Sequence, residues 1–170
     1  MPHPIRTVLT PRRALGVAAG AAIATTALAG AIAAGQSPGP HTVTLIEREA
    51  GATFTHIRNT PPPSRRANMA GDVLAFTNPL VREDGTRAGR FHTSCITTIG
   101  AADFRRSLLT CTGVMELTDG TITFAAVLRS DGRAVTAAVT GGTGAYDGAR
   151  GSVTSTPIRG GSRDVVTLRD

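Results

Sequence analysis

After residue 40, the chain is a succession of short runs rich in β-branched residues, and hardly any stretch keeps a helical period. Turn residues separate these runs. Asp119-Gly120 and Asp131-Gly132 each stand between two of them, and Asp-Gly is a strong signal for a tight β-hairpin. The run over residues 72–78 is expected to end at Pro79. About eight strands at this spacing predict an all-β fold, either an antiparallel barrel or a sandwich.

The alternation of side chains within these runs favours a barrel with a cavity. Ile122, Phe124, Ala126 and Leu128 lie on one face of the run over 121–128. In the run over 72–78, one face carries Leu74, Phe76 and Asn78, so that an amide ends an apolar row. Aromatic residues make up only 4% of the chain, and small residues are frequent in the runs. A solid sandwich core would need more bulk, whereas a barrel around a cavity would not.

The N-terminal part has the layout of a secretory signal peptide. Arg6, Arg12 and Arg13 precede an uncharged apolar stretch over 14–34, which contains small residues suited to cleavage. A retained membrane anchor is the alternative, since the stretch is just long enough to span a bilayer. We expect a signal peptide over 1–34, a linker over 35–42 and one barrel domain over 43–170 in a secreted protein.

The charge of the chain argues against nucleic-acid binding. All 18 basic residues are arginine, and removal of the three in the leader would leave 15 against 12 acidic residues, a net charge of +3. These arginines are scattered, and the chain has one Tyr and no Trp to stack on bases. Nucleic-acid binding requires a clustered basic surface. We therefore expect no nucleic-acid partner.

Cys95 and Cys111 are the two cysteines of the chain. In an exported protein, an even pair is more often a disulfide than a metal or catalytic site, and those two roles remain the alternatives. A disulfide here would close a loop of about 15 residues, which stabilises a fold by about 3 kcal/mol in the chain-entropy account.

The segment AVTGGTGAYDGARGSV over 138–153 contains five glycines and raises the question of a phosphate-binding loop. Such a loop needs a following helix and usually a lysine, but a β-rich run follows and the chain has no lysine. The glycines therefore predict a wide turn between two strands.

Three segments resemble, in order, signature segments of plant allene oxide cyclases and of the related dirigent proteins. They are GDVLAFTNPL over 71–80, RAGRFHTSC over 87–95 and AVTGGTGAYDGARG over 138–151. The resemblance covers roughly residues 43–158 and is strongest to secreted bacterial proteins with an allene-oxide-cyclase-like barrel. It implies an eight-stranded antiparallel β-barrel with a hydrophobic cavity, often trimeric, so that a homo-oligomer is expected. The family folds a reactive, mostly apolar substrate along one stereochemical course and requires no metal or cofactor.

Carried over residue by residue, the resemblance implies four catalytic residues and five ligand contacts. The catalytic set is Glu47, Glu49, Asn78 and Arg150, and the ligand contacts are Leu74, Phe76, Phe91, Cys95 and Tyr146. Glu49 stands where the cyclases have an amide, and Thr77 and Asn78 replace the paired acids of the dirigent proteins. These departures argue against both plant reactions in this chain.

Several of these residues have a structural alternative. Glu47 and Glu49 could belong to an exposed strand face, Arg150 could pair with Asp147, and Tyr146 could cap the barrel end by packing. The corresponding functions are a cofactor-independent cyclase or isomerase, a lipocalin-like carrier of an apolar molecule, and, more weakly, a purely structural barrel.

Overall fold

The computed structural model describes residues 41–59 and 68–169. All of them belong to one compact unit, Gln36–Asp170. The expected signal peptide over 1–34 and most of the expected linker over 35–42 lie outside the described residues. None of the helical structure within 41–59 and 68–169 has the length and hydrophobicity of a membrane-spanning helix.

Nine antiparallel strands and one short 3-10 helix, η1, make up the described fold. The elements are β1 (His41–Arg48), β2 (Thr53–Ile57), β3 (Val73–Val81), β4 (Arg87–Ile99), η1 (Phe104–Arg106), β5 (Leu108–Leu117), β6 (Gly120–Arg129), β7 (Val135–Gly144), β8 (Arg150–Ile158) and β9 (Gly161–Arg169).

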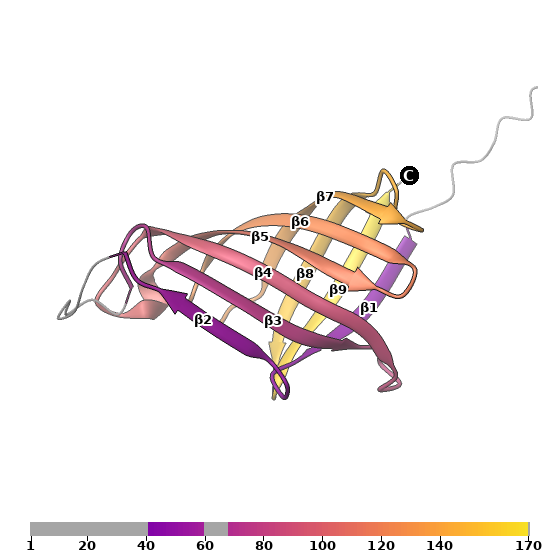
Figure 1. The fold of residues 1–170 in the computed structure, drawn as a ribbon, viewed down its shortest axis with the longest axis horizontal. Coiled ribbons are helices and arrows are strands. Elements are labelled where there is room, and N and C mark those ends of the chain that lie inside the picture. Colours follow the sequence, from indigo (N-terminus) through magenta and orange to yellow (C-terminus); the bar gives the residue numbers. More distant parts are fainter. Residues whose placement is uncertain (1–40, 60–67, 170) are drawn as a thin grey trace, which may run out of the picture. The chain divides into compact units, whose positions relative to one another are not determined.

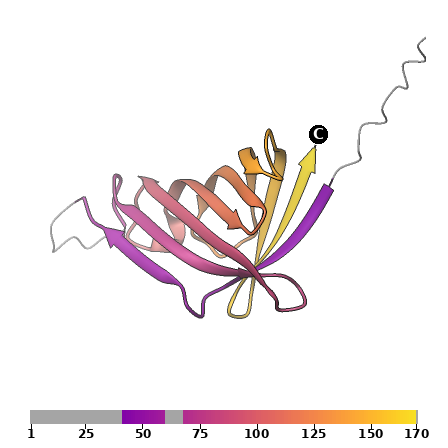
Figure 2. The same ribbon diagram turned by 45° about the vertical axis from the view of Figure 1, so that its right-hand side comes forward.

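Eight of the strands close into a barrel, as the sequence predicts. Hydrogen-bonded neighbours follow the order β1-β9-β8-β7-β6-β5-β4-β3, and β1 returns to β3 through the pairs Ile46–Val81 and Glu47–Leu80. Figure 1 shows the sheet curling round until β1, β8 and β9 run across the direction of β3 to β6. The ninth strand, β2, pairs only with β3 in the described sheet, and Figure 2 shows it at the outer edge beside β3.

The prediction that the strand ends at Pro79 is wrong, because β3 continues to Val81. The reason is the change of partner along one edge of β3. β2 pairs with residues up to Thr77, and β1 pairs only from Leu80 onward. Pro79 lies in the gap between the two partners, where a missing backbone N–H breaks no ladder on that side. The first strand also begins within the expected linker, since His41 already pairs with Leu168 of β9.

The glycine-rich segment forms a turn, and it begins later than the sequence suggests. Gly141, Gly142 and Gly144 still belong to β7, and the turn itself occupies residues 145–148. Gly142 is required by close backbone approach, because a Cβ there would lie 2.3 Å from the carbonyl oxygen of Tyr146. Tyr146 packs on the barrel core, and its hydroxyl donates to Asp119 at 3.1 Å.

Tyr146→Phe is expected to lower the free energy of unfolding by about 1 kcal/mol, the net value of one hydrogen bond. The ring and its packing remain, and only the bond to Asp119 is lost. Urea unfolding at pH 7 measures the difference. Asp119→Ala should cost a similar amount, and the double variant should cost no more than either single one. If the losses in free energy of unfolding of the two single variants added up fully in the double variant, this would contradict the hydrogen bond.

The strand alternation places the apolar rows inside the barrel in two clusters. The first contains Leu45, Leu80, Met115, Ile122 and Val166, all at most 1% exposed. The second contains Leu74, Leu109 and the two cysteines. The predicted inward row of β6 and the inward row of β3 are both confirmed by these clusters and by the cavity between them.

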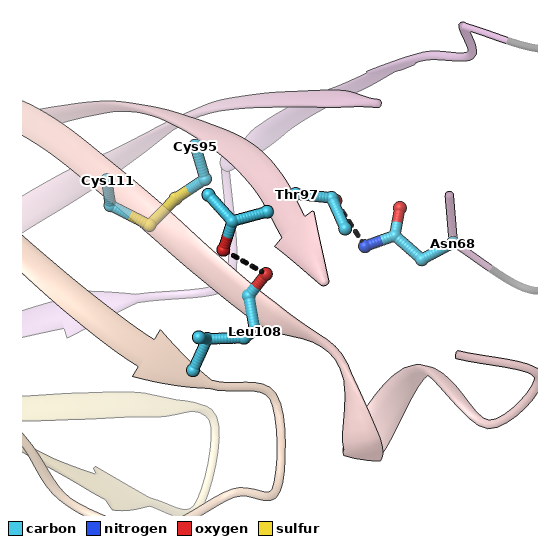
Figure 3. Close-up of a disulfide and its surroundings, with 6 residues drawn as sticks. Asn68, Cys95, Thr97, Leu108 and Cys111 are labelled. Atoms are coloured by element: carbon cyan, nitrogen blue, oxygen red, sulfur yellow. Dashed lines mark hydrogen bonds between the residues drawn. A yellow bond between two sulfur atoms is a disulfide. The ribbon is translucent and has the colours of Figure 1, made fainter. Parts of the chain in front are cut away.

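Cys95 and Cys111 form the expected disulfide. They face each other directly across β4 and β5, with a Cα–Cα distance of 4.0 Å, and both are 2% exposed. Figure 3 shows the bond beside a contact near the end of β4, in which Asn68 donates to the Thr97 hydroxyl at 2.5 Å. Thr98, the next residue, donates to the carbonyl of Leu108 at 3.2 Å. The disulfide therefore ties together the strands on one side of the cavity.

Candidate functional site

A cavity of about 290 Å³ lies inside the barrel, where the two core clusters meet. Its wall is apolar over most of the circumference. Its apolar lining residues include Phe76, Phe91, Phe124, Leu128, Val135 and Ala137. Small residues at Ala126 and Ala137 leave the space that larger side chains would fill.

Three phenylalanines, from β3, β4 and β6, form one continuous aromatic surface of this wall. Phe91 of β4 stacks on Phe76 of β3 with ring centroids 6.1 Å apart, and on Phe124 of β6 with centroids 5.0 Å apart. Offset stacking of this kind is favourable and holds the rings in place. The surface can therefore orient a flat apolar molecule laid against it.

One polar group, the Glu47 carboxyl, is buried in this apolar space. Glu47 stands where β1 closes the barrel, opposite Leu80 of β3 on one side and Ser162 of β9 on the other. The Asn78 amide donates to its Oε1, and the Ser162 hydroxyl lies 3.1 Å from its Oε2. The side chain is only 9% exposed, and it lines the cavity together with Asn78 and Ser162.

The surroundings of Glu47 raise the pKa of its carboxyl to about 7. Burial is the largest cause, since it disfavours the charged form, and the nearby carboxylate of Asp164 is the next. Hydrogen bonds from Ser162 and Asn78 act in the opposite direction but do not cancel these effects. Near neutral pH, the carboxyl is thus close to the midpoint between acid and base.

Asp164 is a second buried carboxyl beside the site, and the sequence analysis missed it. It is fully buried, its Oδ1 lies 3.1 Å from the Ser162 hydroxyl, and its Oδ2 has no hydrogen-bond partner. Burial raises its pKa as well. A signal was present in the sequence, because Asp164 begins an inward row with Val166 and Leu168, where a carboxyl is out of place.

Five of the predicted catalytic and ligand-contact residues line the cavity, namely Glu47, Glu49, Asn78, Phe76 and Phe91. Of these, Glu49 lies just past the end of β1 and is exposed. The expected alternative of one exposed face for Glu47 and Glu49 therefore applies to Glu49 alone. Leu74 and Cys95 are buried in the second core cluster and do not line the cavity, whereas Cys111 does.

Arg150 and Tyr146 lie away from this cavity. Tyr146 borders a separate hollow with His41, at the start of β1, whereas Glu47 is near the end of that strand, about 20 Å away at the rise of a β-strand. The Arg150 guanidinium donates to the carbonyl of Ala149 at 2.9 Å and does not pair with Asp147. The turn motif thus supplies no cation to the Glu47 site.

The Thr93 hydroxyl is a further polar group of the cavity wall that the sequence analysis did not single out. Thr93 is 7% exposed, and its Oγ1 is buried without a hydrogen-bond partner. An unpaired buried hydroxyl is costly unless a water or a ligand completes it. It therefore offers a bound molecule one donor and one acceptor.

A larger hollow, of about 740 Å³, lies on the outer face of the sheet, but it offers few reactive side chains. Its outward side chains are mostly threonines, and three of these bond to one another or to His92. Thr123 and Thr140 lie 2.9 Å apart, and Thr77 lies 3.1 Å from His92. No group of three or more His, Cys, Asp or Glu suited to a metal ion occurs among residues 41–59 and 68–169. The interior cavity is therefore the candidate site.

The closed antiparallel barrel and its interior cavity place this protein among the small β-barrels that enclose a cavity. Its cavity contains a buried carboxyl. A family model described as the allene oxide cyclase barrel-like domain matches residues 53–167. The chain belongs to this family. No curated protein sequence matches it.

Solved structures share the fold at low sequence identity. Pyocyanin demethylase is 21% identical, with a TM-score of 0.62 over 75% of this chain and 99% of that chain. The Diels-Alderase AbmU from Streptomyces koyangensis is 14% identical, with a TM-score of 0.54 over 79% and 70%. A pterocarpan synthase dirigent protein is 16% identical, with a TM-score of 0.53 over 76% and 88%. At these identities the likeness concerns the fold alone.

Proposed function

We propose that this protein binds a small, largely apolar molecule inside the barrel and steers its cyclisation or isomerisation. The buried Glu47 carboxyl carries this proposal. Burying a carboxyl in an apolar cavity is costly, and a pocket that only sheltered an apolar molecule would gain nothing from it. A group whose pKa is about 7 can both give and take a proton at neutral pH. Such perturbed groups in cavities are typical of reactive sites.

The remaining residues have supporting roles in this proposal. The three stacked phenylalanines hold the ligand in one orientation and exclude water, which is the positioning part of catalysis. Asn78 keeps the carboxyl of Glu47 in place through its amide. Glu49 lines the solvent-exposed part of the cavity. The reaction is the substrate's own, so we propose no cofactor. The cavity of about 290 Å³ is at the small end for ligand pockets, about 300–1,000 Å³, and selects a compact ligand.

The relatives support ring chemistry only by analogy of fold. A Diels-Alderase and a pterocarpan synthase dirigent protein share this barrel, and the name of the first describes a ring-forming reaction. Pyocyanin demethylase shows that the barrel also hosts another reaction. The carboxyl in the cavity is therefore a stronger basis for the proposal than any single relative.

A non-catalytic carrier is the second candidate, and one observation favours it. Both oxygens of Glu47 already have hydrogen-bond partners, in Asn78 and Ser162. If those bonds persist with a ligand bound, the carboxyl stabilises the barrel and does not react with the ligand. We further propose that the protein is exported, because a disulfide is typical of an oxidising compartment.

Ala137→Leu is expected to weaken ligand binding strongly, because three added carbons project into the cavity from β7. Ala138→Leu is the matched control, since the next residue on the same strand is exposed. Fluorescence titration with N-phenyl-1-naphthylamine, a compact neutral fluorophore, measures binding. We expect at least a tenfold weaker affinity for Ala137→Leu and an unchanged affinity for Ala138→Leu. Equal binding by both variants would place the ligand outside the barrel.

Native mass spectrometry of the protein recovered from its own host then identifies the natural ligand. A bound compact apolar molecule would supply the substrate for a turnover assay. Asn78→Leu should abolish that turnover while the protein still unfolds cooperatively. Binding without any turnover in the wild type would leave the carrier as the function.

A further inference from the structure

We propose that Asp164 is a positioning residue that keeps one proton on Glu47 through the Ser162 hydroxyl, so that the cavity contains an acid ready to exchange a proton with a bound ligand. The exchange with a ligand rests on the proposed function. The sharing of the proton between the two side chains rests on the structure alone.

The geometry of Ser162 requires one proton for two carboxyls. Its Oγ lies 3.1 Å from Glu47 Oε2 and 3.1 Å from Asp164 Oδ1. A serine hydroxyl has one hydrogen and can donate to one of these oxygens at a time. If both carboxyls were ionised, Ser162 could donate to only one of them. Its oxygen would then face the second carboxylate oxygen with no hydrogen between them, and their lone pairs would repel each other. With one proton on Glu47, its Oε2 donates to Ser162, and Ser162 donates to Asp164.

Glu47 holds this proton because Asp164 is the neighbour that carries the negative charge. A like charge nearby disfavours ionisation, and Asp164 is the principal charged group that raises the pKa of Glu47. Asp164 is fully buried, and the hydroxyls of Ser155 and Ser162 are the groups that favour its charged form. Removal of the Glu47 proton would place two negative charges side by side in this space.

Among residues 41–59 and 68–169, no cation on the elements packed around the two carboxyls relieves their repulsion. Asp164 faces Leu45 of β1 and Ser155 of β8 across the ladders. Apart from Asp164, the other titratable group near Glu47 is Glu49 at the mouth, which also raises its pKa. The residues lining the cavity include no basic side chain. Arg163, between Ser162 and Asp164, pairs with Glu83 on the outer surface at 2.8 Å.

In a reaction, Glu47 would transfer its proton to an oxygen of the ligand and become a carboxylate. The bond from hydrogen to Glu47 breaks, and the bond from hydrogen to the ligand oxygen forms. The reverse transfer restores the acid when the ligand loses a proton from another atom. The ligand class is therefore an apolar molecule with a carbonyl or hydroxyl oxygen that reaches the Glu47 end of the cavity.

Titration of the carboxyl carbons by ¹³C NMR in the ligand-free protein tests the proposal. In the wild type we expect Glu47 to titrate near pH 7. Asp164→Asn should move this midpoint to lower pH by on the order of one pH unit, because the like charge is removed. Ser162→Ala should also move it to lower pH, because in the proposed network Ser162 accepts from the protonated Glu47 and does not donate to its carboxylate, so the variant loses a bond that holds the proton. Glu83→Gln removes an exposed charge near β9 and should change nothing.

A Glu47 midpoint that is the same in Asp164→Asn and the wild type would overturn the proposal, as would a wild-type midpoint below pH 5. If Asp164→Asn does not fold, the downward shift in Ser162→Ala still decides the question, and an upward shift or no shift there counts against the proposal. These readouts need no ligand. Failure of N-phenyl-1-naphthylamine to bind would contradict the proposed function and leave the proton sharing intact.

Discussion

Glu47→Gln is expected to raise the free energy of unfolding at pH 8 by about 3 kcal/mol and to leave it nearly unchanged at pH 4. The carboxyl has a pKa of about 7 in the folded protein and about 4.3 in the unfolded chain. Between these values the folded state binds the extra proton, so stability falls as the pH rises and is lowest above pH 7. Glutamine has no proton to lose and avoids this cost.

Urea unfolding of wild type and Glu47→Gln at pH 4, 6 and 8 measures this effect. The two proteins should differ increasingly as the pH rises, while Gln can still accept the amide bond from Asn78. Glu83→Gln is the control, because its carboxylate is exposed and pairs with Arg163 at the surface. If the free energies of unfolding of the two proteins differed by the same amount at all three pH values, Glu47 would not retain its proton in the folded protein near neutral pH. A gain in stability together with a loss of turnover would indicate a residue kept for function.

Replacing both cysteines by alanine is expected to cost about 3 kcal/mol of stability. The disulfide joins residues 16 apart in sequence and removes conformations from the unfolded chain. For a domain of this size, such a loss lowers the melting temperature by roughly 10 °C. Differential scanning calorimetry of Cys95→Ala/Cys111→Ala measures it, and the wild type with its disulfide reduced should melt at nearly the same temperature.

Thr110→Ala is a suitable control for this variant, because it is an exposed neighbour on β5 that should change stability by less than about 0.5 kcal/mol. A loss below about 1 kcal/mol in the double alanine variant would mean that the strands hold their register without the covalent bond. Binding of N-phenyl-1-naphthylamine by the same variant then reports whether the cavity survives, since Cys111 is part of its wall.

The strands and their inward faces were predictable from local sequence. Alternation placed Leu74, Phe76 and Asn78 on one face of β3, and the Asp-Gly pairs marked two of the hairpins. Both signals act over a few residues, since a strand's side chains alternate whatever it pairs with. The resemblance to the cyclases added Glu47. Arg150 came from the resemblance to the dirigent proteins, but its guanidinium bonds to backbone carbonyls of its own turn.

The sequence by itself determined that this chain forms an antiparallel β-barrel and which rows of side chains face its interior. The tertiary structure alone decided which of those rows meet. Glu47 of β1, Asn78 of β3 and Asp164 of β9 come together only because β1 closes the barrel between β3 and β9. The burial and mutual repulsion that shift the pKa of Glu47 arise from this closure, and no local pattern encodes the distance between residues more than a hundred positions apart.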